Sequence, residues 1–156
     1  MDNTALMRRA ISLAEEMMRA GKGGPFGAVV AKDGEIVGEG YNQVTSLNDP
    51  TAHAEIVAIR QACDTLGDFR LDGCEIFANC EPCPMCLSAI YWARMDRIYY
   101  ANTRADAARI GFDDATIYEQ LQLPVGRRSI AATRLLADEA EPAFREWDEM
   151  EDKIVY

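Results

Sequence analysis

One histidine, one glutamate and two cysteines form the pattern in this sequence that is best suited to chemistry. His53 is the only histidine and stands two residues before Glu55, while Cys83 and Cys86 are separated by two residues. Side chains at positions i and i+3 share one face of a helix, so both sulfurs can point the same way. Imidazole and thiolate are donors that zinc prefers, and a catalytic zinc keeps its fourth position for water. His53, Cys83 and Cys86 are therefore predicted to hold one Zn²⁺ per chain.

Glu55 lies close enough to such a site to carry protons, and its spacing from His53 makes a ligand role less favoured. Histidine-x-glutamate followed by proline-cysteine-x-x-cysteine is the signature of zinc deaminases, and both halves occur here in that order. Zinc lowers the pKa of its water toward about 7. Glu55 is predicted to take a proton from that water and deliver it first to a ring nitrogen and then to the departing amine.

The elements that must position these residues can be predicted from periodicity and turn signals. Residues 4–20 have helical spacing, with Thr4 as a cap and Gly21 as the stop. Asp33 and Gly34 predict a type I′ turn between two antiparallel strands. A second helix is expected from Asp49–Pro50 to Leu66–Gly67, followed by a strand over 74–79. A third helix is then expected from Pro82 through Ala93, followed by a strand over 97–101.

The last third of the chain gives weaker signals. The pattern predicts helices near 104–110 and 116–122, a weak strand near 129–135 and an acidic C-terminal helix. Alternating strands and helices predict an α/β fold, a three-layer α/β/α sandwich around a mixed sheet. No linker interrupts the chain, so residues 1–156 are expected to form a single domain.

Composition and charge narrow the classes of partner. The formal net charge of −10 disfavours a polyanionic partner such as nucleic acid, because binding to phosphates rests on basic side chains. No apolar run approaches the roughly 18 residues of a membrane span, and the first residues lack the pattern of a signal peptide. A cytoplasmic protein that acts on a small molecule is therefore expected.

Over almost its full length the chain resembles the cytidine deaminase-like superfamily, most closely the bacterial guanine deaminase branch. The segments that carry this resemblance are Gly23–Val30, Asn48–Glu55, Cys80–Cys86, Ala89–Arg94, Gly111–Asp114 and the final Tyr156. The resemblance implies the cytidine deaminase-like fold and hydrolysis of guanine to xanthine and ammonia by attack at C2, a step of purine catabolism.

The same resemblance implies roles for residues that the spacing arguments do not reach. It implies that Phe26 stacks on the purine, that Asn42 bonds its edge and that Asp114 bonds ring N–H groups, with Ala54 also contacting the substrate. It further implies a homodimer that exchanges C-terminal segments. Trp92 and Tyr156 would then close either their own pocket or that of a neighbour.

Several alternatives stay open at this stage. Phe26 alone is typical of a strand core, Asn42 of a turn, Trp92 of a core or an interface, and Asp114 of a helix cap. Cytosine, a triazine amine or tRNA adenosine are alternative substrates, and the charge speaks against tRNA. Cys80 could complete a closed structural zinc site in an interaction module, and Cys83 with Cys86 could form a redox pair.

Overall fold

A mixed sheet of four strands organises the first part of the chain. The computed structural model describes all of residues 1–156, which divide into two units, Met1–Asp114 and Ala115–Tyr156. The strand order is β2-β1-β3-β4, with bounds β1 Gly27–Lys32, β2 Glu35–Tyr41, β3 Cys74–Cys80 and β4 Arg97–Asn102. β1 is antiparallel to both of its neighbours, whereas β3 and β4 are parallel, which confirms the predicted mixed sheet.

The turn between β1 and β2 confirms the hairpin prediction. Asp33 has a φ of 51° and Gly34 a φ of 78°. A type I′ turn needs positive φ at both central residues, and the twist of this turn matches that of the strands it joins. The hairpin brings Phe26, which precedes β1, next to Asn42, which follows β2, through a hydrogen bond from Asn42 N–H to the Phe26 carbonyl (3.0 Å).

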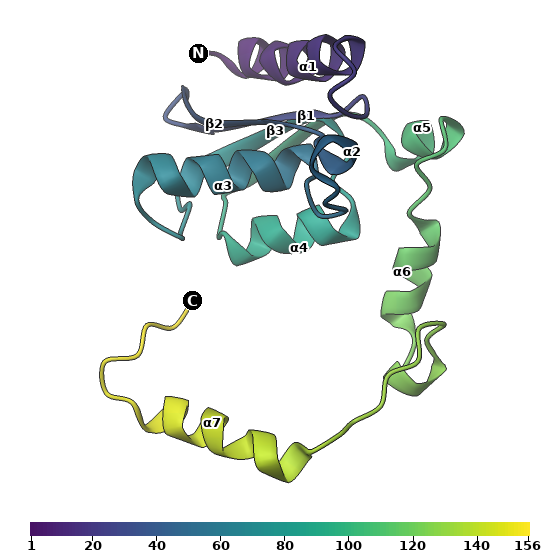
Figure 1. The fold of residues 1–156 in the computed structure, drawn as a ribbon. Coiled ribbons are helices and arrows are strands. Elements are labelled where there is room, and N and C mark those ends of the chain that lie inside the picture. Colours follow the sequence, from purple (N-terminus) through teal and green to yellow (C-terminus); the bar gives the residue numbers. More distant parts are fainter. The chain divides into compact units, whose positions relative to one another are not determined.

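Helices cover both faces of the sheet (Figure 1). α1 (Asn3–Arg19) packs on one face, and α3 (Ala54–Leu66) and α4 (Pro84–Trp92) lie on the other. Successive strand residues face opposite sides, so Val29 joins the core under α1 while Val30 joins the core under α3. The sheet with its two helical layers confirms the predicted three-layer α/β/α sandwich.

Two helix starts differ from the sequence prediction. α1 is capped by Asp2, whose Oδ1 accepts a hydrogen bond from Ala5 N–H (2.7 Å), and not by Thr4. The prediction that the second long helix begins at Asp49–Pro50 is wrong, because Asp49 instead closes a turn by accepting from Thr51 N–H (2.8 Å). α3 begins at Ala54 with His53 at its N-cap.

The region before and after α3 contains further small differences. A short helix, α2 (Val44–Leu47), precedes the Asp49 turn, and α3 ends at Leu66 as predicted. α4 begins at Pro84 and not at Pro82, so Cys83 becomes its N-cap residue. Both corrections move metal-ligand candidates to the N-termini of helices.

The C-terminal third is helical without a sheet. α5 (Arg104–Arg109) closes the first unit, and the second contains α6 (Ala115–Gln122), the 3₁₀ turn η1 (Val125–Arg127) and α7 (Ala137–Glu149). The strand expected near 129–135 is not formed: these residues have no regular secondary structure, and every strand of the sheet comes from residues before 103. No residue of α6 or α7 is buried. None of the helices in the structure combines the length and apolarity of a membrane span.

Candidate active site

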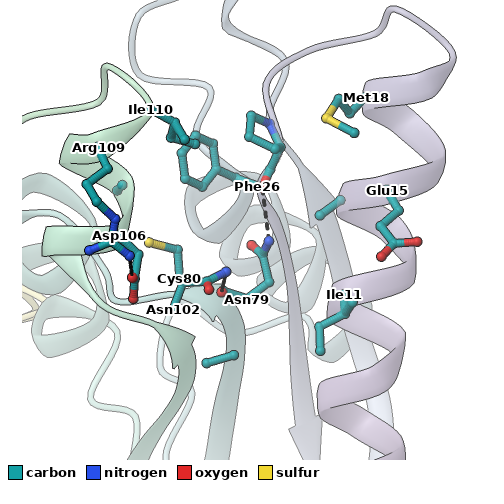
Figure 2. Close-up of a pocket in the computed structure, with 14 residues that line it drawn as sticks. Ile11, Glu15, Met18, Phe26, Asn79, Cys80, Asn102, Asp106, Arg109 and Ile110 are labelled. Carbon is teal, nitrogen blue, oxygen red and sulfur yellow. Dashed lines mark hydrogen bonds and ion pairs between the residues drawn. The ribbon is translucent and has the colours of Figure 1, made fainter.

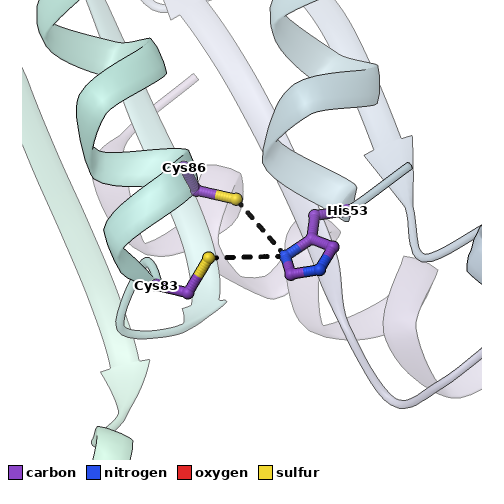
Figure 3. A group of neighbouring side chains, drawn as sticks. All are labelled: His53, Cys83 and Cys86. Atoms are coloured by element: carbon purple, nitrogen blue, oxygen red, sulfur yellow. Dashed lines mark hydrogen bonds between the residues drawn. The ribbon is translucent and has the colours of Figure 1, made fainter. Parts of the chain in front are cut away.

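Three side chains from the N-termini of two helices converge beside the sheet (Figure 3). His53 is the N-cap of α3, Cys83 is the N-cap of α4, and Cys86 lies in the first turn of α4. The Nδ1 atom of His53 is 3.5 Å from the sulfur of Cys83 and 3.5 Å from that of Cys86. The three ligand atoms all lie within 4.8 Å of one another, so the structure brings together the predicted metal ligands.

The spacing of these atoms fits zinc. Bonds of about 2.3 Å to sulfur and about 2.0 Å to nitrogen, at a tetrahedral angle, place nitrogen and sulfur about 3.6 Å apart. The observed separations of 3.5 Å agree with this value. Three protein ligands leave the fourth tetrahedral position for water, which is the arrangement of a catalytic zinc.

Cys80 does not join the cluster. Its buried thiol points to the Thr103 carbonyl, 3.8 Å from the sulfur, and burial raises its pKa to about 11. Its sulfur is not among the ligand atoms that lie within 4.8 Å of one another, which belong to His53, Cys83 and Cys86. The closed four-ligand site that Cys80 could have completed is therefore not the arrangement in this structure.

Close packing fixes the start of α3. A Cβ atom at Gly40 would lie 2.1 Å from the Ala54 carbonyl oxygen, so β2 approaches the first turn of α3 more closely than any side chain would allow. Gln43 N–H also donates to the Ala52 carbonyl (2.9 Å). The sheet thus sets the position of His53 through its immediate neighbours.

Cys83 is the more acidic of the two thiols. A hydrogen bond from the Cys86 thiol lowers the pKa of Cys83 to about 4, and the same bond raises the pKa of Cys86. The bond to Cys83 raises the pKa of His53. A cation bound here would replace these protons, because coordinating thiols are deprotonated. The donor set is thus suited to a divalent ion.

Glu55 is buried beside the cluster. Its side chain is 8% exposed and hydrogen-bonds to Cys86. Burial raises the pKa of the carboxyl group, and the Cys83 thiolate adds to this rise. A carboxyl group with a raised pKa can both accept and release a proton near neutral pH, as an acid–base catalyst must.

The candidate base-binding residues Phe26 and Asn42 lie at one end of the β1–β2 hairpin, and Ala54 begins α3. The ring of Phe26 packs against the core on the α3–α4 face and meets Phe112 edge-on, with 4.9 Å between ring centroids. Asn42 is buried, and its Oδ1 accepts from the N–H groups of Gly24 and Val44 (3.3 Å each). Ala54 is buried at the first position of α3, next to His53.

The remaining candidates lie in different surroundings. Asp114 forms an ion pair with Arg104 (3.7 Å). Burial raises the pKa of Asp114, Arg104 opposes this rise, and the charge of Cys83 adds to it. Trp92 is exposed at the last position of α4, about 9 Å along the helix axis from Cys86. Tyr156 belongs to the second unit, where it is also exposed.

Sequence reasoning missed residues that support the site without carrying its chemistry. Asn79 is a buried amide near the end of β3 that bonds the backbone on both sides of Phe26. The signal for it was a polar side chain within the apolar second half of β3. Phe112 and Arg104, which contact Phe26 and Asp114, gave no local signal of these roles.

Known proteins of similar sequence include several deaminases. Residues 1–102 match the family model described as the cytidine and deoxycytidylate deaminase zinc-binding region. The guanine deaminase of Bacillus subtilis is 48% identical over 156 residues, which is all of both chains. A tRNA-specific adenosine deaminase of Agrobacterium fabrum is 49% identical over 76 residues, covering 49% of this chain and 50% of the other.

Structural comparison also groups this chain with deaminases. The X-ray structure of Bacillus subtilis guanine deaminase matches with a TM-score of 0.96, covering 100% of this chain and 99% of that one. The guanine deaminase of Nitrosomonas europaea, 30% identical, matches with a TM-score of 0.67 over 72% of this chain and 65% of that chain. With its metal ligands in place, this chain belongs to the zinc-binding cytidine and deoxycytidylate deaminase family and is a zinc-dependent hydrolase.

Proposed function

We propose that this protein hydrolyses guanine to xanthine and ammonia. The observation that carries the proposal is the full-length likeness to a guanine deaminase, which includes the second unit, Ala115–Tyr156. The likeness to tRNA-specific adenosine deaminases is partial, from 49% of the chain for that of Agrobacterium fabrum to 78% for that of Haemophilus influenzae. A net charge of −10 also opposes binding of a polyanionic tRNA.

His53, Cys83 and Cys86 hold the metal in this proposal. Zinc bound there supplies Lewis acidity and lowers the pKa of a water molecule that completes its coordination. The two cysteines sit at the N-terminus of α4, where the helix dipole stabilises negative charge on sulfur. The helix and the thiolates thus stabilise each other when the site is loaded.

Glu55 moves the protons. It accepts one proton as water adds to C2 of guanine and delivers it to the adjacent ring nitrogen, which interrupts the aromatic system. It then takes the second proton from the new hydroxyl group and gives it to the amine. The C2–N bond breaks, ammonia leaves, and the carbonyl of xanthine forms. The raised pKa of Glu55 suits both directions of transfer.

Phe26 and Asn42 orient the base. The Phe26 ring supplies a flat face for stacking, and contact with Phe112 limits its rotation. The Asn42 Oδ1 atom is already used by two backbone N–H groups. Its Nδ2 group is therefore the one that donates to an acceptor on the purine edge. Asp114 is proposed to accept from ring N–H groups, with Arg104 holding its carboxylate.

Ammonia release by zinc-loaded protein tests the substrate. The panel contains guanine, guanosine, cytosine, adenine, an aminotriazine and a tRNA anticodon stem-loop. Preferential turnover of guanine supports the proposal, while turnover of another member keeps the chemistry and overturns the substrate. Absence of ammonia from every member would leave zinc with a structural role.

Glu55→Gln is the control that tests the proton carrier. The amide keeps the shape of the side chain but cannot accept a proton, so kcat should fall by about 10²- to 10⁴-fold. Zinc content, measured by atomic absorption on the same preparations, should remain one per chain. Turnover close to the wild-type rate in a zinc-loaded variant would remove Glu55 from the mechanism.

We also infer a homodimer that exchanges C-terminal segments in the cytoplasm. The second unit supports this inference, because α6 and α7 bury no residue while Phe144 and Tyr156 are exposed. Exposed apolar surface of this kind is typical of a segment that packs against another chain. Light scattering during size-exclusion chromatography measures the molar mass, and a monomer at micromolar concentration would contradict the inference.

A further inference from the structure

One buried amide, that of Asn79, holds the backbone on both sides of Phe26, and Figure 2 shows its bond on the Pro25 side. The Asn79 Oδ1 atom accepts a hydrogen bond from Gly27 N–H (2.9 Å), and its Nδ2 group donates to the Pro25 carbonyl (2.9 Å). Asn79 is 9% exposed. Its side chain therefore makes two well-formed bonds to one three-residue segment.

These bonds begin where the pairing of β1 with β3 stops. The last ladder pair at this end of the two strands is Ala28 with Ala78. The next residues, Gly27 and Asn79, are joined through the Asn79 side chain and no longer as a backbone pair. The amide thus continues the contact between β3 and β1 beyond their last backbone pair, to the segment that carries Phe26.

Asn79 and Phe26 line the same cavity, together with Ile11 and Ala14 of α1. Phe26 also packs against the core on the α3–α4 face. The two hydrogen bonds of Asn79 go to the backbone of Pro25 and Gly27 and not to the ring. The amide thus holds the backbone of the segment and leaves the ring of Phe26 without a polar contact to it.

The other restraints on Phe26 act in different directions. Its N–H donates to the Gly24 carbonyl (2.8 Å), and its carbonyl accepts from Asn42 N–H (3.0 Å). These bonds tie Phe26 to its own loop and to the end of β2. Only the Asn79 bonds, among those described for this segment, tie it to β3, the strand that leads directly to Cys83.

We propose that Asn79 is a positioning residue that sets the height and tilt of Phe26 for stacking on the substrate base. The proposal rests on the proposed function, because Phe26 acts there as the stacking surface. Stacking contributes alike to the bound substrate and to the transition state, so its loss raises KM and leaves kcat nearly unchanged. Substitution of a residue that merely stabilises the fold would not raise KM while leaving kcat nearly unchanged.

The test compares three variants in steady-state kinetics with guanine. Asn79→Ala removes both bonds and should raise KM about tenfold, within the range that base–aromatic stacking contributes. Asn79→Ser has a hydroxyl that can meet one of the two backbone groups and should fall between Asn79→Ala and wild type. Asn102→Ala is the matched control, because Asn102 Nδ2 bonds the Asn79 carbonyl (3.0 Å) and not the Phe26 segment. Its KM should stay at the wild-type value.

A double-mutant cycle with Phe26→Leu separates positioning from general stability. If Asn79 acts through Phe26, then Asn79→Ala should add little to the rise in KM once the ring is gone. Guanine binding to the same variants in a Glu55→Gln background, measured by calorimetry, should repeat the pattern without turnover. Should Asn79→Ala fail to fold, Asn79→Ser is carried through the same cycle.

Two results would overturn the proposal. One is additive effects of Asn79 and Phe26 substitutions on KM, and the other is a fall in kcat with KM unchanged. Wild-type turnover on the panel decides the proposed function separately. If another base is the substrate, the cycle is measured with that base, so the two failures are distinguishable.

Discussion

The two units of this chain are built in opposite ways. In Met1–Asp114 a sheet with helices on both faces buries two apolar clusters, and the metal-ligand candidates extend from that framework. In Ala115–Tyr156 neither α6 nor α7 buries a residue, and Phe144 is 83% exposed. A helix without an apolar contact gains little to offset its loss of conformational entropy.

The two units therefore differ in what they can contribute to the active site. Metal chemistry requires ligand atoms held to a few tenths of an ångström, which only side chains on rigid elements provide. The first unit meets that need through the N-termini of α3 and α4. The second unit carries apolar side chains that need a surface to cover them, so its contribution depends on what it packs against.

The largest effect expected in the first unit is the loss of one thiolate. Cys86→Ser should remove zinc and abolish ammonia release, because the hydroxyl is a poor substitute for a buried thiolate ligand. Zinc content and turnover are measured together. Cys80→Ser is the matched control, since its hydroxyl can still donate to the Thr103 carbonyl, and it should keep both. Loss of zinc from the Cys80 variant would instead support a closed zinc site with Cys80 as its fourth ligand.

A smaller effect is expected from Tyr156 in the second unit. If this residue closes a substrate pocket, Tyr156→Ala should reduce kcat/KM about tenfold, as truncation of an aromatic contact commonly does. Zinc content should not change. The value of kcat/KM with guanine therefore measures how far the second unit takes part in the site.

Mixing two inactive or weak variants shows whose pocket Tyr156 completes. The Glu55→Gln chain retains Tyr156, and the Tyr156→Ala chain retains Glu55. If the C-terminal segments are exchanged, a mixed dimer contains one site with both residues, and co-expression should give more activity than the two variants separately. Activity equal to their sum would show that each chain closes its own pocket.

The sequence was sufficient for the metal centre because zinc restricts its donors so strongly. With one histidine in the chain, few ligand sets are possible, and the i, i+3 spacing of Cys83 and Cys86 fixes their common direction. The start of α3 could not be found in the same way. Asp49 followed by Pro50 is equally suited to a helix cap and to a closed turn, and only packing selects the turn.

Hydrogen bonds between residues far apart in the sequence could not be predicted from any local pattern. The partners of Asn79 are backbone atoms of Gly27 and Pro25, which lie 52 and 54 residues away in sequence. Nothing in β3 indicates which carbonyl or N–H group its amide will meet. The prediction of a strand near 129–135 was wrong for a related reason. The β-propensity of a segment does not form a strand by itself, because a strand also needs a neighbouring strand to pair with, and residues 129–135 pair with none.

The last effects expected are on stability, and they come from two glycines, one in each unit. A Cβ atom at Gly27 would lie 2.3 Å from the Ala10 carbonyl oxygen and 2.7 Å from Ala14 N, where β1 meets α1. Gly27→Ala should therefore destabilise the protein by ~1–3 kcal/mol through overpacking. At Gly126 in the second unit, a Cβ atom would meet nothing within 4 Å. Gly126→Ala should change stability by less than ~0.5 kcal/mol or increase it slightly.

Urea unfolding at one fixed zinc concentration measures both substitutions, because bound metal adds to apparent stability. A lower midpoint for Gly27→Ala with an unchanged one for Gly126→Ala would extend the contrast between the units from geometry to free energy. Equal destabilisation by Gly27→Ala and Gly126→Ala would contradict this contrast, because an added methyl group is costly only where other atoms already surround it. The surface around Gly126 would then be covered in solution, and the second unit would be as closely packed there as the first.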